Sequence, residues 1–204
     1  MEKLLALIAE TNDEEDVTIR FAGATWSAAS LQLELAVSLS DSVPAIWEVR
    51  CQDVLASALC DMDANWLELL DDRPLLWEYK CESAKAFFYR APVSADAAVG
   101  ALYEAHQNAV GPWISFGRYL NRAPSLSKLL AAGNELLAGG PVPLLNTYKE
   151  TLCPHGVEPD LRFTHPPRAW DGTQWRQLER QGTKALILSD SYVVGNGFAA
   201  RQKS

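Results

Sequence analysis

Two segments near the start of the chain alternate apolar and polar residues with a period of two. Residues 17–21 (VTIRF) and 31–39 (LQLELAVSL) each carry an apolar side chain at nearly every second position. That period is typical of strands that bury one face. We therefore expect two half-buried strands, connected through Gly23 and the small residues that follow it.

A duplicated segment predicts two further strands. Residues 41–51 (DSVPAIWEVRC) and 71–81 (DDRPLLWEYKC) share Asp, Pro, Trp, Glu and Cys at equivalent positions. Side chains alternate between the two faces of a strand. The pattern therefore predicts two equivalent strands of one antiparallel sheet, with Trp47 and Trp77 buried on the same face.

The glutamates of the duplication, Glu48 and Glu78, would lie on the opposite face and admit two interpretations. Each has a basic residue two positions later, so Glu48 could face Lys80 while Arg50 faces Glu78. Such cross-strand pairs contribute about 0.2–1 kcal/mol each. The alternative makes Glu48 and Glu78 a catalytic pair of one acid and one base or nucleophile. The neighbouring basic residues favour ordinary ion pairing.

The middle of the chain changes to the helical period of 3.6 residues. Ser94 is a suitable N-cap for a helix whose apolar stripe includes His106 and ends at Gly111. Ser125 is expected to open a second helix that carries leucines as far as Leu137. Pro143 suits the first turn of a third helix, which ends near Gly156.

The remaining segments are extended in character or ambiguous. Residues 84–90, 185–188 and 192–194 favour strands, whereas residues 52–70 are compatible with either a helix or strands. The order strands, helices, strands indicates an α+β fold. No linker interrupts it, so we expect a single domain over residues 1–204: strand-rich from 17 to 90, helical from 94 to 156, and strand or loop from 157 to 204.

Composition and charge argue against several classes of function. The 204 residues are 48% hydrophobic and 22% charged, as in an ordinary globular protein. The net charge of −8 argues against nucleic-acid or membrane partners. No signal peptide or membrane-length apolar stretch is recognisable, so we expect a cytoplasmic protein. The four cysteines are then expected to be reduced and mostly buried.

One acidic motif begins like a calcium loop. Asp61, Asp63 and Asn65 have the alternating spacing of its first ligands. The sixth position needs glycine and the twelfth a bidentate glutamate, but Trp66 and Asp72 occupy them. At most a weak surface cation site remains.

A second group of potential metal ligands lies toward the end of the chain. Cys153, His155 and His165 could supply three zinc ligands, with Asp160 as a fourth. Their spacing matches none of the usual zinc patterns. We therefore expect no metal site and no cofactor, and we interpret His106 as a hydrogen-bonded residue at the edge of the core.

The segment from 162 to 180 is distinguished by its tryptophans and arginines. Such residues dominate the hot spots of protein interfaces, and a Pro-Pro pair restrains the chain there. The candidate binding residues are His165, Arg168, Trp170, Trp175 and Arg176. The alternative is that both tryptophans cover the core while the arginines extend outward to solvent.

No strong catalytic motif accompanies these features. The leading hypothesis is therefore a non-catalytic cytoplasmic binding protein, such as an acidic inhibitor or an immunity-type protein, whose partner is another protein. The alternative is a small hydrolase that uses Glu48 and Glu78, or the region from His155 to His165.

Overall fold

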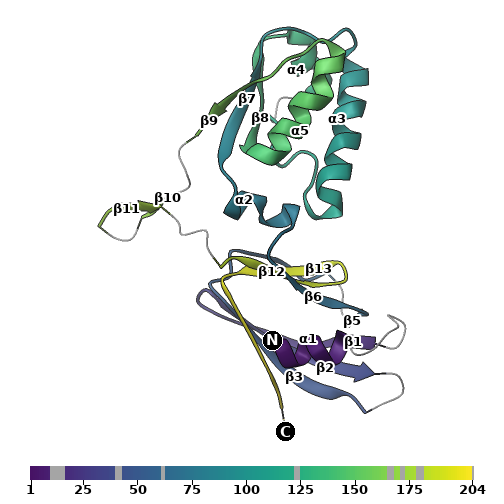
Figure 1. Cartoon of the computed structure of the whole chain (residues 1–204), viewed down its shortest axis with the longest axis vertical. Helices are drawn as coiled ribbons and strands as arrows, with labels where there is room; N and C mark the ends of the chain where they lie inside the picture. Colours follow the sequence, from purple (N-terminus) through teal and green to yellow (C-terminus); the bar gives the residue numbers. More distant parts are fainter. Residues whose placement is uncertain are drawn as a thin grey trace. The chain divides into compact units, whose positions relative to one another are not determined.

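The structure is a computed structural model that describes residues 1–9, 17–39, 43–60, 63–121, 125–164, 168–170, 173–177 and 182–203. The chain divides into two compact units (Figure 1). Unit 1 comprises Met1–Leu76 and Gln181–Ser204, and unit 2 comprises Trp77–Arg180. The α+β class is confirmed, with an N-terminal sheet, central helices and C-terminal strands. The expectation that residues 1–204 form one domain stays a prediction.

Unit 1 consists of antiparallel strands and short helical segments. Its elements are α1 (Glu2–Ala9), β1 (Val17–Ser27), β2 (Ser30–Leu39), β3 (Ala45–Gln52), β4 (Ala56–Ala58), β5 (Asp63–Ala64), β6 (Leu67–Leu70), η2 (Pro74–Leu76), β12 (Lys184–Leu188), β13 (Ser191–Gly195) and β14 (Gly197–Gln202). The strands form two sheets, with the orders β14-β3-β2-β1-β5 and β4-β13-β12-β6. The C-terminal strand β14 thus completes the N-terminal sheet.

The core of unit 1 lies between these two sheets. Alternate residues of β2, from Leu31 to Val37, are buried together with Leu186 and Leu188 of β12. The period-two prediction for β1 and β2 is therefore confirmed. The predicted connection begins later than Gly23, because β1 continues to Ser27 and only Ala28 and Ala29 form the turn. The register shifts between Phe21 and Gly23 as in a β-bulge.

Unit 2 packs helices against a small sheet. Its elements are α2 (Trp77–Lys80), β7 (Ser83–Phe88), α3 (Ala95–Val110), η3 (Gly111–Trp113), α4 (Leu126–Ala132), β8 (Glu135–Pro141), α5 (Val142–Leu152), η4 (Cys153–His155), β9 (Asp160–Phe163), β10 (Arg168–Trp170) and β11 (Trp175–Gln177). The sheet has the order β8-β7-β9, and α3, α4 and α5 share a buried core with it (Figure 1). The strand predicted over 84–90 and the N-caps Ser94 and Ser125 are confirmed.

The duplication does not produce equivalent strands, so that prediction is wrong. Residues 45–52 form β3, whereas 74–80 form a 3-10 turn followed by the helix α2. The backbone N–H of Cys81 donates to the carbonyl of Trp77 at 2.9 Å, which is a helical bond. Strand β3 is paired on both sides, by β2 and by β14. Tertiary pairing therefore decides the conformation of two segments of similar sequence.

The helix that opens at Ser125 is shorter than predicted. It ends at Ala132, because Gly133 has the left-handed φ of +75°, and a Cβ at this position would lie only 2.8 Å from the backbone N of Ala91. The following leucines belong to β8, which pairs with β7. The ambiguous stretch 52–70 contains β4, β5 and β6 and no helix among its described residues.

No disulfide joins any of the four cysteines, and the expectation that they are mostly buried is wrong. Cys51 is buried and Cys81 is partly buried, whereas Cys60 and Cys153 are exposed. Burial raises the pKa of the Cys51 thiol to about 12. In the described part of the chain, no helix is long and apolar enough to cross a membrane.

Candidate functional site

The predicted contact segment contains an antiparallel hairpin. Strands β10 and β11 pair with the register Arg168↔Gln177, Ala169↔Arg176 and Trp170↔Trp175 (Figure 1). Two candidate residues, Trp170 and Trp175, are therefore directly opposite each other in the backbone ladder. A third candidate, Arg176, is opposite Ala169. His165 lies outside the described residues.

This hairpin forms a two-stranded sheet of its own. Among the described strands, none pairs with the outer edge of β10 or of β11. Unpaired strand edges carry N–H and C=O groups that can bind a further strand from another chain. The sequence predicted a proline-anchored loop here, and the described backbone shows strands where Arg168, Trp170, Trp175 and Arg176 lie.

The two units differ in net charge. Unit 1 contains 7 basic and 16 acidic residues, whereas unit 2 contains 11 basic and 10 acidic residues. The net charges are therefore −9 and +1. The hairpin belongs to the unit that is not acidic, so an acidic partner would meet less repulsion there than at unit 1.

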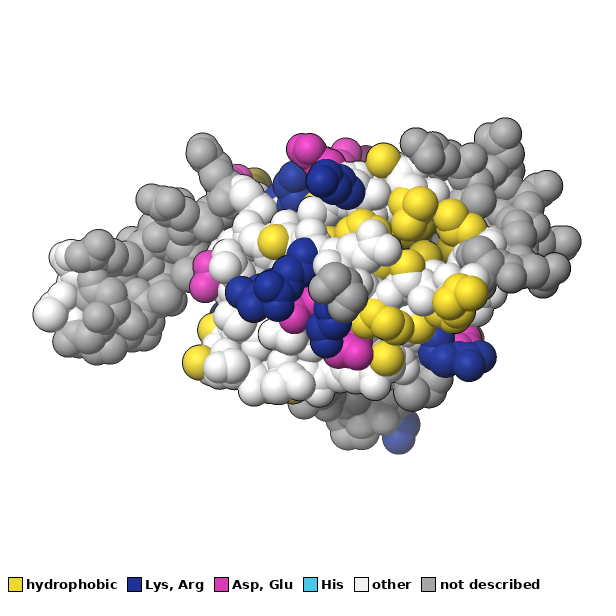
Figure 2. All heavy atoms as spheres, turned by 90° about the horizontal axis from the view of Figure 1, so that it is seen from below, with side chains coloured by type: hydrophobic (Ala, Val, Ile, Leu, Met, Phe, Trp, Pro, Cys, Tyr) yellow, Lys and Arg dark blue, Asp and Glu magenta, His cyan; other side chains and the backbone are white. Residues whose placement is uncertain are grey.

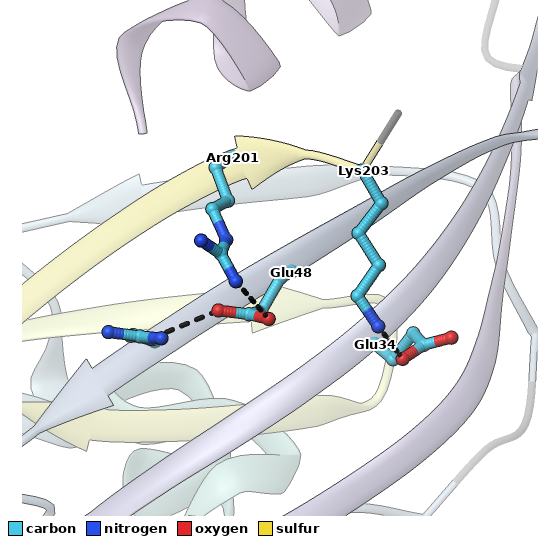
Figure 3. A network of polar contacts seen from close by, with 5 residues as sticks. Glu34, Glu48, Arg201 and Lys203 are labelled. Atoms are coloured by element: carbon cyan, nitrogen blue, oxygen red, sulfur yellow. Dashed lines mark hydrogen bonds and ion pairs between the residues drawn. The ribbon is translucent and has the colours of Figure 1, made fainter.

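Glu48 lies at the centre of an ion-pair network on the N-terminal sheet of unit 1. Its side chain is only 4% exposed. The Nε of Arg50 donates to one carboxylate oxygen at 3.0 Å, and Arg201 of β14 donates to the other at 3.1 Å (Figure 3). Both carboxylate oxygens are thus occupied. The expected pairing of Glu48 with Lys80 is wrong, and Arg201 takes that place.

A second carboxylate of this sheet, that of Glu34, is paired with a second cation from the C-terminal segment. Glu34 of β2 is directly opposite Glu48 in the ladder, and like charges at such positions repel. Lys203 pairs with Glu34 while Arg201 pairs with Glu48 (Figure 3). Basic and acidic side chains also alternate on the face of unit 1 shown in Figure 2, with hydrophobic side chains gathered toward one side.

The network predicts a pH-dependent stability. The hydrogen bond from Arg201 lowers the pKa of Glu48 below its ordinary value of 4.5, and this outweighs the opposing effect of burial. A carboxyl group whose pKa is lower in the folded state stabilises that state above its ordinary pKa. The stabilisation is lost as the pH falls below about 4.5 through the folded-state value. We expect Glu48→Gln to flatten the fall in melting temperature between about pH 5 and pH 3.

The matched control is Glu68→Gln, which removes a carboxylate of unit 1 that is 50% exposed and lies outside this network. Thermal melts followed by circular dichroism at several pH values measure both variants. A pH profile of Glu48→Gln that is identical to that of the wild type would contradict the prediction.

Glu78 lies in unit 2 and has different partners. Its carboxylate accepts from Arg118 at 2.6 Å and from the Tyr119 hydroxyl at 3.0 Å. The expected contact between Glu78 and Arg50 is wrong, because Arg50 is bound to Glu48. The two glutamates of the duplication therefore serve separate ion pairs in separate units.

His106 is a hydrogen-bonded core residue, as the sequence indicated. Its ring is fully buried, with Nδ1 at 2.7 Å from the Tyr148 hydroxyl and Nε2 at 2.7 Å from the carbonyl oxygen of Ile114. A carbonyl only accepts, so Nε2 donates to it, and in the tautomer with its proton on Nε2 the Nδ1 atom accepts from the Tyr148 hydroxyl. Burial raises the pKa of the Tyr148 hydroxyl, which keeps it a donor.

Two of the potential metal ligands, Asp63 and Asn65, are bound by other side chains of the protein. Asp63 pairs with Arg20 at 2.9 Å, and the side-chain oxygen of Asn65 accepts from Ser189. Cys153 and His155 lie in η4. Within the described residues, no group of three or more His, Cys, Asp or Glu side chains could hold a metal ion. Asp61 and His165 lie outside those residues.

Some contacts could not be found by reading local patterns. Arg201 binds Glu48 across 153 positions of the chain, and Arg118 and Tyr119 bind Glu78 across about 40. For Arg201, the sequence offers one signal, the basic character of residues 161–204, which carry 7 basic and 3 acidic side chains.

The fold and these contacts define an α+β protein with an ion-paired sheet in one unit and a separate hairpin in the other. No protein-family model matches the chain, and neither a curated protein nor a solved structure does.

Proposed function

We propose that this chain is a non-catalytic binding protein whose partner is another protein with an acidic contact surface, in the manner of an acidic inhibitor or an immunity-type protein. The observation that carries the proposal is the hairpin β10–β11, which forms its own two-stranded sheet and aligns Trp170 with Trp175. An isolated hairpin is only marginally stable in water. A partner that covers it would stabilise it.

The residues of the hairpin suit recognition of carboxylates. Tryptophan contributes a large contact area at a low cost in conformational entropy, and arginine binds carboxylates through two parallel hydrogen bonds. Arg168 and Arg176 lie on the two strands of this hairpin. A phosphate backbone suits it less, because the net charge of −8 would repel nucleic acid.

The engagement of Glu48 favours this interpretation over a small hydrolase that uses the two glutamates as a pair. Both carboxylate oxygens of Glu48 are bound by arginines, whereas Arg118 and Tyr119 bind the same oxygen of Glu78. A catalytic carboxylate needs an oxygen available to a proton or to a substrate atom, which Glu48 lacks. We place the function in the cytoplasm, where the exposed thiols of Cys60 and Cys153 stay reduced.

The test replaces the hairpin residues and measures capture of the partner. We expect the double variant Arg168→Ala, Trp170→Ala to bind the captured partner at least about 5- to 30-fold more weakly, as for hot-spot residues worth about 1–2 kcal/mol. Affinity capture with the wild-type chain identifies the partner. Titration calorimetry with the purified partner then measures the dissociation constants.

The matched control is Arg20→Ala, Trp26→Ala, which removes the same residue types from β1. The Arg20 and Trp26 side chains are 68% and 53% exposed. This control is expected to bind like the wild type. Unchanged affinity in a folded hairpin variant would place the contact surface elsewhere, and unfolding of that variant would show that Trp170 belongs to the core.

A further inference from the structure

A pocket of about 440 Å³ opens in unit 2, separate from the hairpin strands. It is lined by Tyr89, Arg90, Cys153, Gly156, Val157 and Glu158. One wall is the segment after β7 and the other is the segment after α5. Pockets that bind small molecules typically have volumes of about 300–1,000 Å³. The size of this pocket therefore suits a small ligand.

Several contacts hold the walls of the pocket. Arg162 of β9 donates to the Tyr89 hydroxyl at 2.5 Å, and its guanidinium lies 4.8 Å from the centre of the Phe87 ring. The backbone N–H of Val93 donates to the carbonyl of His155 at 3.2 Å, which connects the two segments. The pocket is thus formed by fixed backbone, with Tyr89 positioned by a neighbouring strand.

Two side chains of opposite charge, Arg90 and Glu158, line this pocket. Among the described residues, neither Arg90 nor Glu158 forms an ion pair or a side-chain hydrogen bond. By contrast, Asp160 and Arg162, on the adjacent strand, pair with each other at 3.2 Å. Val157 is only 1% exposed and adds an apolar portion to the lining. A ligand with one anionic group and one cationic group would complement this surface.

We propose that the pocket binds a small zwitterion with the chemistry of an amino acid or a short peptide. Its carboxylate would accept hydrogen bonds from the Arg90 guanidinium, and its ammonium group would donate to the Glu158 carboxylate. Both contacts are charge-assisted and thus stronger than neutral hydrogen bonds. This site is additional to the proposed protein-binding function and does not depend on the hairpin.

The thiols of the chain provide the readout. Cys153 lines the pocket and is exposed, whereas Cys60 is exposed in unit 1. We expect a bound zwitterion to slow alkylation of Cys153 by iodoacetamide while Cys60 reacts at an unchanged rate. The probes are the twenty free L-amino acids and glycyl dipeptides at up to about 10 mM, above the millimolar range of weak specific binding. Peptide mass spectrometry of the full chain measures both rates.

The role of the charges in binding is tested by removing them from the ligand and, separately, from the protein. The N-acetyl and C-amide forms of any protecting probe are each expected to bind about tenfold more weakly, the loss typical of one hydrogen bond to a charged group. Arg90→Gln and Glu158→Gln are expected to weaken the unmodified probe to the same degree. The matched controls, Lys85→Gln and Glu82→Gln, remove exposed charges that do not line the pocket.

Three results would overturn the proposal. One is the absence of Cys153 protection by every probe. Another is equal affinity for the free and the blocked forms of a probe, because the charges would then not be recognised. The third is unchanged affinity in both Arg90→Gln and Glu158→Gln. Circular dichroism verifies that the variants fold.

Discussion

Replacing Trp47 with alanine is expected to lower the free energy of unfolding by about 3–5 kcal/mol, the usual cost of removing a buried aromatic side chain. Trp47 is 5% exposed and lies in the core between the two sheets of unit 1. It occupies β3, which is paired with β2 on one side and with β14 on the other. Urea denaturation followed by circular dichroism measures the loss.

Two control variants separate the contributions. The indole Nε1–H of Trp47 is buried and has no hydrogen-bond partner among the described residues, so Trp47→Phe removes a donor that is unsatisfied there. We expect it to cost much less than Trp47→Ala. Trp77→Ala should also cost less, because its side chain is only partly buried in α2. A cost for Trp77→Ala equal to that for Trp47→Ala would contradict this account.

The comparison of Trp47 with Trp77 shows where the sequence was informative and where it was not. Alternation over residues 31–39 predicted β2 correctly, because one buried face requires a period of two. Identity between two segments did not predict identical structure. Residues 45–52 have hydrogen-bonding neighbours on both sides, whereas Pro74 begins a 3-10 turn that continues into α2.

The end of the helix that begins at Leu126 was also predicted incorrectly. Leucines at helical spacing continue past Gly133, so periodicity alone extended the helix from 126 to 137. The left-handed Gly133 ends it at Ala132, and the later leucines enter β8. A glycine followed by Asn134 is also a turn signal. The local turn chemistry was therefore more reliable than the apolar pattern.

The candidate sites were predictable only in part. Residue types singled out the tryptophans and arginines of 162–180, and the backbone places Trp170 opposite Trp175. Partners from distant parts of the chain were not predictable, as with Arg201 at Glu48. The pocket combines Arg90 with Glu158, which are separated in the sequence by one strand, three α-helices and two 3-10 helices. Proximity of that kind arises from the packing of unit 2.

Replacing His106 with alanine is expected to destabilise unit 2 by about 3 kcal/mol or more. The substitution leaves a cavity and removes the partners of two buried groups, the Tyr148 hydroxyl and the Ile114 carbonyl. His106 also contacts the Phe116 ring edge-on, with ring centres 5.4 Å apart. Through these contacts α3 is joined to α5 and to the segment after η3. Urea denaturation measures the loss, and hydrogen exchange of peptides from α3 and from β2 locates it.

A double-mutant cycle distinguishes the hydrogen bond from simple packing. Tyr148→Phe leaves Nδ1 of His106 buried without its donor, and His106→Leu leaves the Tyr148 hydroxyl buried without its acceptor. Each single variant is therefore expected to lose about 1–3 kcal/mol from the orphaned group. The double variant removes both groups, so its loss should be smaller than the sum of the two by about 0.5–3 kcal/mol. Strict additivity would show that His106 and Tyr148 contribute only through their volumes, and that the hydrogen bond between α3 and α5 does not stabilise the core.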